Sequence, residues 1–194
     1  MMMQNRRKVA LLISYHGGER TALSSKDAVM LYEDLTCVGC IGASDIQFLA
    51  RRGTPYSESV PTAQNIERAF RTLGSHGHYG NECIVLLDGR FDVYSMELPD
   101  QPMDLDLLSA LIEALGCSSV QVFIHGPGSD LAPDRLQAPG RVLVYSSRLD
   151  RGEKLEDPFM ISRVFQGDEV MLTKVQNERS RLNVLGYELN WTRC

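Results

Sequence analysis

Short, almost continuously apolar segments recur along the chain, and they constrain its fold more than any other feature. They are KVALLISY at 8–15, CIVLL at 83–87, VQVFI at 120–124 and RVLVY at 141–145. Strands that are apolar throughout are typical of a parallel sheet buried on both faces. The predicted fold class is therefore α/β, a three-layer α/β/α sandwich with a mostly parallel central sheet.

The segments between these strands favour helices. Apolar residues recur at helical spacing in 25–39, 65–73 and 104–115, and Thr62 is placed to cap the second of these helices. A further strand is predicted at 45–49, and helices at 157–166 and 169–185. We expect one domain over 1–194, with a core at about 8–167 followed by a C-terminal helix and tail at 168–194.

The bulk composition excludes several classes of function. The 194 residues include 20 Lys and Arg against 25 Asp and Glu, a net charge of −5, which argues against a nucleic-acid-binding face. No run is long and apolar enough for a membrane helix, and the N-terminal VALLISY is better explained as a strand than as a leader. Five cysteines without framework spacing favour a reducing, cytoplasmic location.

Candidate functional groups follow the predicted strands, because function in parallel sheets collects at the carboxyl ends of the strands. These ends read Tyr15-His16-Gly17-Gly18, Asp88-Gly89-Arg90, His125-Gly126-Pro127-Gly128-Ser129 and Ser146-Ser147-Arg148. Neither G-x-x-x-x-G-K-[ST] nor G-x-G-x-x-G is present, so no nucleotide or other cofactor is predicted. Cys37 and Cys40 form a C-x-x-C without the second pair that a zinc site needs, so no metal is predicted.

Four stretches taken in order resemble the caspase-like cysteine peptidases, the metacaspases and their legumain-type relatives, over 8–167. The stretches are KVALLISY with its following helix, DIQFLARRGTPYSESVPTAQNIERAFRTL, GNECIVLLDG, and SSVQVFIHGPGSD with RVLVYSSRLDRGEKLEDPFMISRVF. The resemblance implies a caspase-like fold in which a Cys nucleophile and a His base stand at adjacent strand ends. Carried over by position, the His falls at Arg90 and the Cys at Pro127, while His125 replaces an acidic residue.

Neither replacement supports the family's chemistry, because proline has no nucleophile and arginine stays protonated at neutral pH. We therefore expect a catalytically inactive, caspase-like module that acts in binding or regulation. Its expected partner is a protein or peptide, which includes a possible homodimer. Binding to nucleic acid or to a membrane is not expected. A remaining cleft could bind an extended peptide by strand addition. Its expected lining is Arg90, His125, Ser129, Ser147 and Arg148.

Two alternatives stay open at this point. An active cysteine peptidase could use a shifted dyad, His76 with Cys83 or Cys117, although both cysteines precede strands and should lie at the opposite end of the sheet. A small-molecule-binding domain of flavodoxin-like type would make the caspase-like pattern a coincidence.

Overall fold

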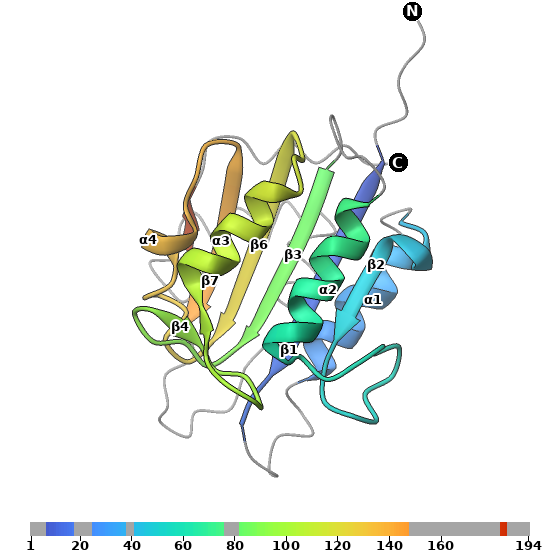
Figure 1. The fold of residues 1–194 in the computed structure, drawn as a ribbon, viewed down its shortest axis with the longest axis horizontal. Coiled ribbons are helices and arrows are strands. Elements are labelled where there is room, and N and C mark those ends of the chain that lie inside the picture. Colours follow the sequence, from blue (N-terminus) through green and yellow to red (C-terminus); the bar gives the residue numbers. More distant parts are fainter. Residues whose placement is uncertain (1–6, 18–24, 38–40, 76–81, 148–182, 186–194) are drawn as a thin grey trace, which may run out of the picture.

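The computed structural model describes residues 7–17, 25–37, 41–75, 82–147 and 183–185. Within these ranges, six strands form one sheet in the order β2-β1-β3-β6-β7-β8 (Figure 1). The strands are β1 (Lys8–Tyr15), β2 (Ile46–Leu49), β3 (Glu82–Gly89), β6 (Ser119–Gly126), β7 (Arg141–Ser147) and β8 (Asn183–Leu185). The first five are parallel, while β8 pairs with β7 in the antiparallel sense.

Helices flank the sheet and confirm the predicted α/β sandwich. They are α1 (Ser25–Cys37), α2 (Ala63–Gly74), α3 (Leu105–Ala114) and the short α4 (Pro133–Leu136), with a 3-10 turn, η1, at Ala43–Asp45. In Figure 1, α2 and α3 lie in front of the sheet and α1 lies behind it.

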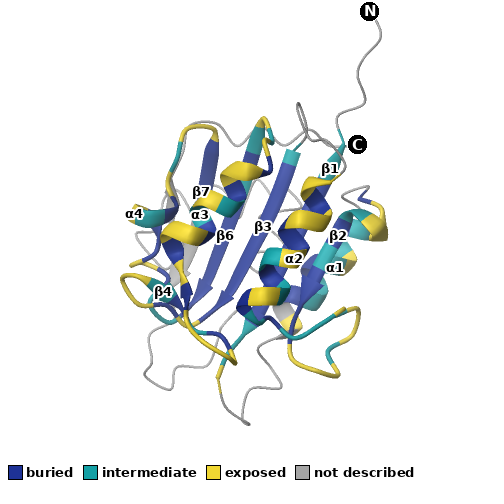
Figure 2. Cartoon of the chain, in the orientation of Figure 1, coloured by how far each residue is buried: buried dark blue, intermediate teal, exposed yellow. Residues whose placement is uncertain are grey.

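Both faces of the sheet are buried, which explains why the strands are apolar throughout. In β1, Val9, Leu11 and Ile13 join the cluster that contains side chains of α2, α3 and α4. The intervening Ala10 and Leu12 join the cluster that contains side chains of α1. The strands of the sheet centre are accordingly the most buried part of the chain (Figure 2).

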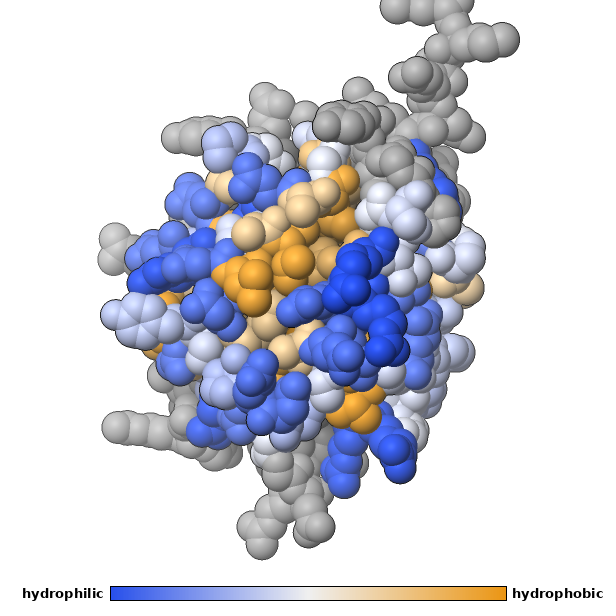
Figure 3. Space-filling model, in the orientation of Figure 1, coloured by the Kyte–Doolittle hydropathy of each residue, from blue (hydrophilic) through white to orange (hydrophobic). Residues whose placement is uncertain are grey.

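The outward face formed by the two front helices is partly apolar. Apolar side chains gather in the middle of the face that carries α2 and α3, and hydrophilic side chains border them (Figure 3). On α3, Leu107 is exposed and Leu111 is partly buried.

Side-chain caps set where the front helices begin. Thr62 caps α2 as predicted, since its side chain accepts a hydrogen bond from the backbone of Asn65 at 3.2 Å. Asp104 caps α3 by accepting from Leu107 N at 2.9 Å. Asp100 instead accepts from Ala63 N at 3.2 Å, so this carboxylate serves the start of α2 rather than that of α3.

Two short strands between β3 and α3 were not predicted. β4 (Ser95–Met96) and β5 (Met103–Asp104) pair in the antiparallel sense. The turn before β4 is held by Asp92, whose carboxylate accepts from Tyr94 N at 2.7 Å and Ser95 N at 2.6 Å. With only two residues each, these strands leave no periodic pattern in the sequence.

The prediction of a helix over 169–185 is wrong for its last three residues. Asn183–Leu185 forms β8, and Val184 stands opposite Val144 of β7. The edge of β7 offers backbone groups that a strand satisfies, and Val is a good strand former, so pairing outweighs the local helical spacing. The predicted helix at 157–166 lies outside the described residues.

A later segment of the chain covers the outer edge of β2. Glu58 N donates to Phe48 O at 2.9 Å, and Ala50 N donates to Ser59 O at 3.0 Å. A parallel bridge also joins Leu49 to Ser59. Phe48 O and Ala50 N at this edge are thus satisfied within the chain.

No helix in the described part of the chain has the length and apolar character needed to cross a membrane.

Candidate functional site

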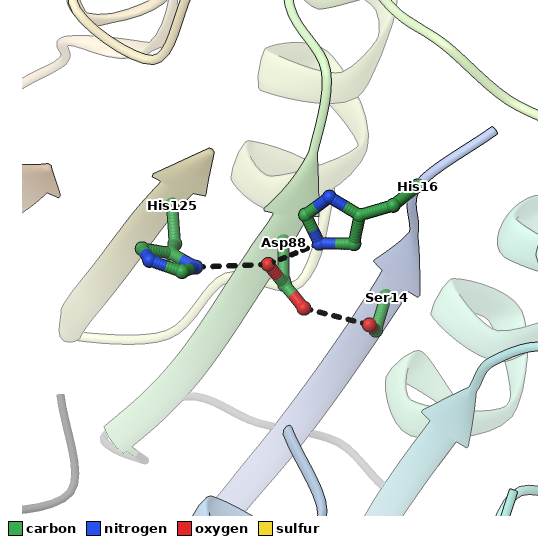
Figure 4. Close-up of polar contacts among 4 residues, drawn as sticks. All are labelled: Ser14, His16, Asp88 and His125. Atoms are coloured by element: carbon green, nitrogen blue, oxygen red, sulfur yellow. Dashed lines mark hydrogen bonds and ion pairs between the residues drawn. The ribbon is translucent and has the colours of Figure 1, made fainter. Parts of the chain in front are cut away.

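Three neighbouring strands bring polar side chains together at the carboxyl end of the sheet. Ser14 of β1 stands opposite Asp88 of β3, and Asp88 stands opposite His125 of β6, so the three form one row across the sheet. His16 follows directly after β1. Figure 4 shows the side chains of the other three residues converging on Asp88.

Asp88 accepts hydrogen bonds from all three neighbours, and we call these four residues the Asp88 network. Ser14 Oγ donates to Asp88 Oδ2 at 2.7 Å. His16 Nε2 lies 2.6 Å from Asp88 Oδ1, and His125 Nδ1 lies 2.9 Å from the same oxygen. The Asp88 side chain is 1% exposed, whereas those of His16 and His125 are 8% and 9% exposed.

The network holds a buried negative charge. Burial by itself would raise the pKa of Asp88, but the hydrogen bonds from His125 and His16 and their positive potential outweigh it and hold this pKa well below its usual value. An ionised carboxylate has no proton to give, so the ring nitrogens that face it act as donors. The charge is therefore compensated by donors from both neighbouring strand ends.

The loops that follow β3 and β6 contact each other through their backbones. Phe91 N donates to Pro127 O at 2.8 Å. A Cβ on Gly126 would lie 2.0 Å from the carbonyl oxygen of Gly89, and one on Gly128 would lie 2.2 Å from that of Phe91. Gly126 has a φ of 119°, so this junction requires glycine for both conformation and space.

The positions that the resemblance assigns to a catalytic pair lie at this junction. Arg90 and Pro127 follow two strands that are direct neighbours in the sheet. The Arg90 side chain is exposed, and its Nε lies 3.6 Å from Oε2 of Glu97. Neither side chain offers a nucleophile or a base at neutral pH.

Two residues of the expected peptide cleft are buried. His125 belongs to the Asp88 network, and Ser129, in the loop that follows β6, is fully buried. The Oγ of Ser129 has no hydrogen-bond partner among the described residues. The cleft itself stays a prediction, with most of the surface of these two side chains covered. Ser147 ends β7, where only its backbone is described, and Arg148 lies outside the described residues.

The cysteines of the alternative dyad lie at the amino end of the sheet, as their sequence positions predict. Cys83 is the second residue of β3, and Cys117 precedes β6. Cys83 lies five positions before Asp88 in β3, which corresponds to about 16 Å along the strand. His76 lies outside the described residues, as does Cys40, whereas Cys37 is the exposed last residue of α1.

The described residues contain no cluster of three or more His, Cys, Asp or Glu side chains arranged to hold a metal ion. In the Asp88 network, the histidine nitrogens contact the carboxylate directly. A metal ligated by the same atoms would have to separate them.

Sequence reasoning named His16, Asp88 and His125 at the ends of the predicted strands, but it did not join them and did not single out Ser14. The end of an apolar segment is the signal that pointed to His16 and Asp88 and could have pointed to Ser14. Their row across the sheet depends on strand order and register, which a single sequence does not specify.

Chemically, the arrangement can orient two imidazole rings toward one buried carboxylate. The hydroxyl within the network, Ser14 Oγ, donates its hydrogen bond to Asp88, whereas the hydroxyl of a nucleophile would donate to a histidine. The network thus joins the ends of β1, β3 and β6. Comparisons with models of protein families and with curated proteins found no match for this chain.

Proposed function

We propose that the chain is a catalytically inactive relative of the caspase-like cysteine peptidases that acts as a protein-binding or regulatory module. The observation that carries this proposal is the junction of the β3 and β6 loops. The two positions that would bear the catalytic pair follow adjacent strands, and they hold Arg90 and Pro127. The neighbourhood that the family's chemistry needs is present, whereas the reactive side chains are replaced.

The histidines near this junction support a structural role. His16 and His125 both contact the buried Asp88, so each ring is oriented toward a fixed charge. A carboxylate can also orient a catalytic histidine, so the structural role rests on the distance between these rings and the described cysteines. The nearest described cysteines lie at the other end of the sheet, beyond the reach of these rings.

Exposed side chains beside the junction suggest where a partner binds. Val93 and Tyr94 project from the turn after β3, and Leu131 projects from the loop after β6; each is more than two-fifths exposed. The guanidinium carbon of Arg135 lies 4.8 Å from the centroid of the Tyr94 ring. Aromatic and arginine side chains of this kind are enriched in protein interfaces. We call Val93, Tyr94, Leu131 and Arg135 the junction surface.

Peptidase assays test the inactivity directly. Purified protein, shown to be folded by circular dichroism, is incubated with fluorogenic peptides that carry Asp, Asn, Arg or Lys before the cleaved bond, with calcium or with chelator. We expect no turnover above buffer. Turnover that iodoacetamide abolishes would contradict the proposal and would place a working cysteine elsewhere in the chain.

A grafted dyad tests the caspase-like assignment. Pro127→Cys and the double variant Arg90→His with Pro127→Cys are compared in a Cys117→Ser background. The carbonyl at 127 still accepts from Phe91 N in both. We expect the cysteine at 127 to be alkylated faster in the double variant than in Pro127→Cys alone. The histidine should also shift this alkylation to lower pH. Equal alkylation profiles would show that the two positions do not face each other and would overturn the assignment.

Binding is tested on an array of twelve-residue peptides. Tyr94→Ala should weaken binding of the peptides that the protein retains. Tyr56→Ala is the matched control, because it removes another exposed tyrosine, in the loop between β2 and α2. Equal effects of both substitutions would exclude the junction surface as the binding site.

A further inference from the structure

Two cysteines from separate segments meet at the amino end of the sheet. Cys83 lies near the start of β3 and is 1% exposed. Cys117 lies in the short connection between α3 and β6, and it is partly buried against the cluster that contains Cys83. Cys83 stands opposite Val120 of β6, and Cys117 lies three residues before Val120, so the two thiols come close enough to interact.

This interaction gives the two thiols different acidities. The interaction with Cys117 and complete burial together hold the pKa of Cys83 well above its ordinary value. The same interaction lowers the pKa of Cys117, against a smaller opposing effect of burial. Cys83 is thus the donor that remains a thiol, and Cys117 is the partner that ionises first.

The connection that carries Cys117 lies at the surface of the molecule. Gly116 has a φ of 65°, and a Cβ built on it would meet no atom within 4 Å. Gly116 and Ser118 are both exposed, whereas Leu115 is buried and anchors the end of α3. The positions on both sides of Cys117 are thus open to solvent, while the end of the helix before them is buried.

We propose that Cys83 and Cys117 are a redox pair, which a peroxide converts to a reversible intramolecular disulfide. The Cys117 thiolate attacks one oxygen of the peroxide, the O–O bond breaks, and the departing hydroxide takes a proton to become water. The sulfur of Cys83 then attacks the sulfenic acid on Cys117. The S–S bond forms as hydroxide leaves, and the thiol proton of Cys83 converts it to water.

Tryptic mapping provides the test, because Arg90 lies between the two cysteines and trypsin separates them. Native full-length protein is treated with hydrogen peroxide, alkylated with iodoacetamide and digested without reductant. We expect one peptide pair joined through Cys83 and Cys117, which dithiothreitol separates. Recovery of both thiols in alkylated form, or of Cys117 as sulfonic acid beside free Cys83, would overturn the proposal.

Variants test whether the thiol of Cys83 reacts with oxidised Cys117 to form the disulfide. In Cys83→Ala, oxidised Cys117 has no partner and should proceed to the sulfinic and sulfonic acids that dithiothreitol does not reverse. In the same variant, alkylation of Cys117 below pH 8 should slow by about threefold to tenfold, since the donor to its thiolate is lost. Cys37→Ser is the matched control and should leave the linked peptide unchanged. An unchanged alkylation rate in Cys83→Ala, together with reversible oxidation, would exclude Cys83 as the resolving group.

Discussion

Buried polar side chains at the two ends of the sheet are stabilised in different ways. At the carboxyl end, Asp88 is kept as a buried charge because two histidines and a serine donate to it. At the amino end, Cys83 is kept neutral beside Cys117. The ionised Asp88 needs several hydrogen-bond donors, which reach it only when three strands are in register. The neutral Cys83 needs only the neighbouring Cys117. We therefore expect the carboxyl end to tolerate substitution far less well.

The largest effect should come from the loop junction. Gly126→Ala places a Cβ 2.0 Å from the carbonyl oxygen of Gly89, so one of the two backbones has to move. We expect a loss of about 4 kcal/mol or more in the free energy of unfolding, or no folded protein. Gly116→Ala is the matched control, because it has a positive φ but open space, and it should cost only about 1–2 kcal/mol. Urea unfolding measures both, and equal losses would show that the junction is not tightly packed.

Next in size is the loss of the buried charge. Asp88→Asn keeps the shape but removes the charge that both histidines face, and we expect a loss of about 2–4 kcal/mol at pH 7. Asp104→Asn makes the same chemical change at the cap of α3, where asparagine caps as well as aspartate, and should be nearly neutral. Urea unfolding of the two variants gives the comparison, and similar losses would contradict the special role of Asp88.

The same network predicts a pH dependence. The pKa of Asp88 is lower in the folded chain than in the unfolded chain, so the unfolded state binds its proton first as the pH falls. The stabilisation is fully present above the ordinary pKa of an aspartate and is lost progressively below it. Unfolding free energies between pH 7 and pH 3 should therefore fall more steeply for the wild type than for Asp88→Asn. Parallel profiles would show that the carboxylate is not stabilised in the folded state.

A smaller effect is expected at the amino end, where Arg141 begins β7. Its guanidinium donates to Ser109 Oγ at 2.7 Å, Leu136 O at 2.9 Å and Ser109 O at 2.8 Å. Arg141→Lys keeps the charge but cannot reproduce the fork, and we expect a loss of about 1–2 kcal/mol. Thermal unfolding of the variant provides the measurement. A loss as large as that of Asp88→Asn would remove the contrast between the two ends.

The smallest effect should come from Arg90, although it occupies a position that the resemblance assigns to catalysis. Its ion pair with Glu97 is largely exposed, so Arg90→Ala should change the unfolding free energy by roughly 0.5 kcal/mol or less. Differential scanning calorimetry of this variant beside the wild type measures the change. A larger loss would mean that Arg90 helps to hold the junction together.

The sandwich could be predicted from the sequence because its causes are local. The buried strands are apolar on both faces, and Thr62 caps α2 through a residue three positions away. The Asp88 network could not be predicted, because Ser14, Asp88 and His125 meet only when β1, β3 and β6 are neighbours in one register. The strand β8 was missed for a related reason, since its structure follows from pairing with β7 rather than from its own three residues.

The segment at 58–59 that runs along the outer edge of β2 has a consequence for self-association. A bare sheet edge can template the addition of strands from other molecules, which is the first step of many fibrils. Here Phe48 O and Ala50 N already make hydrogen bonds with Glu58 and Ser59, so these backbone groups cannot pair with a neighbouring molecule. At high concentration, this side of the protein should resist strand-by-strand growth.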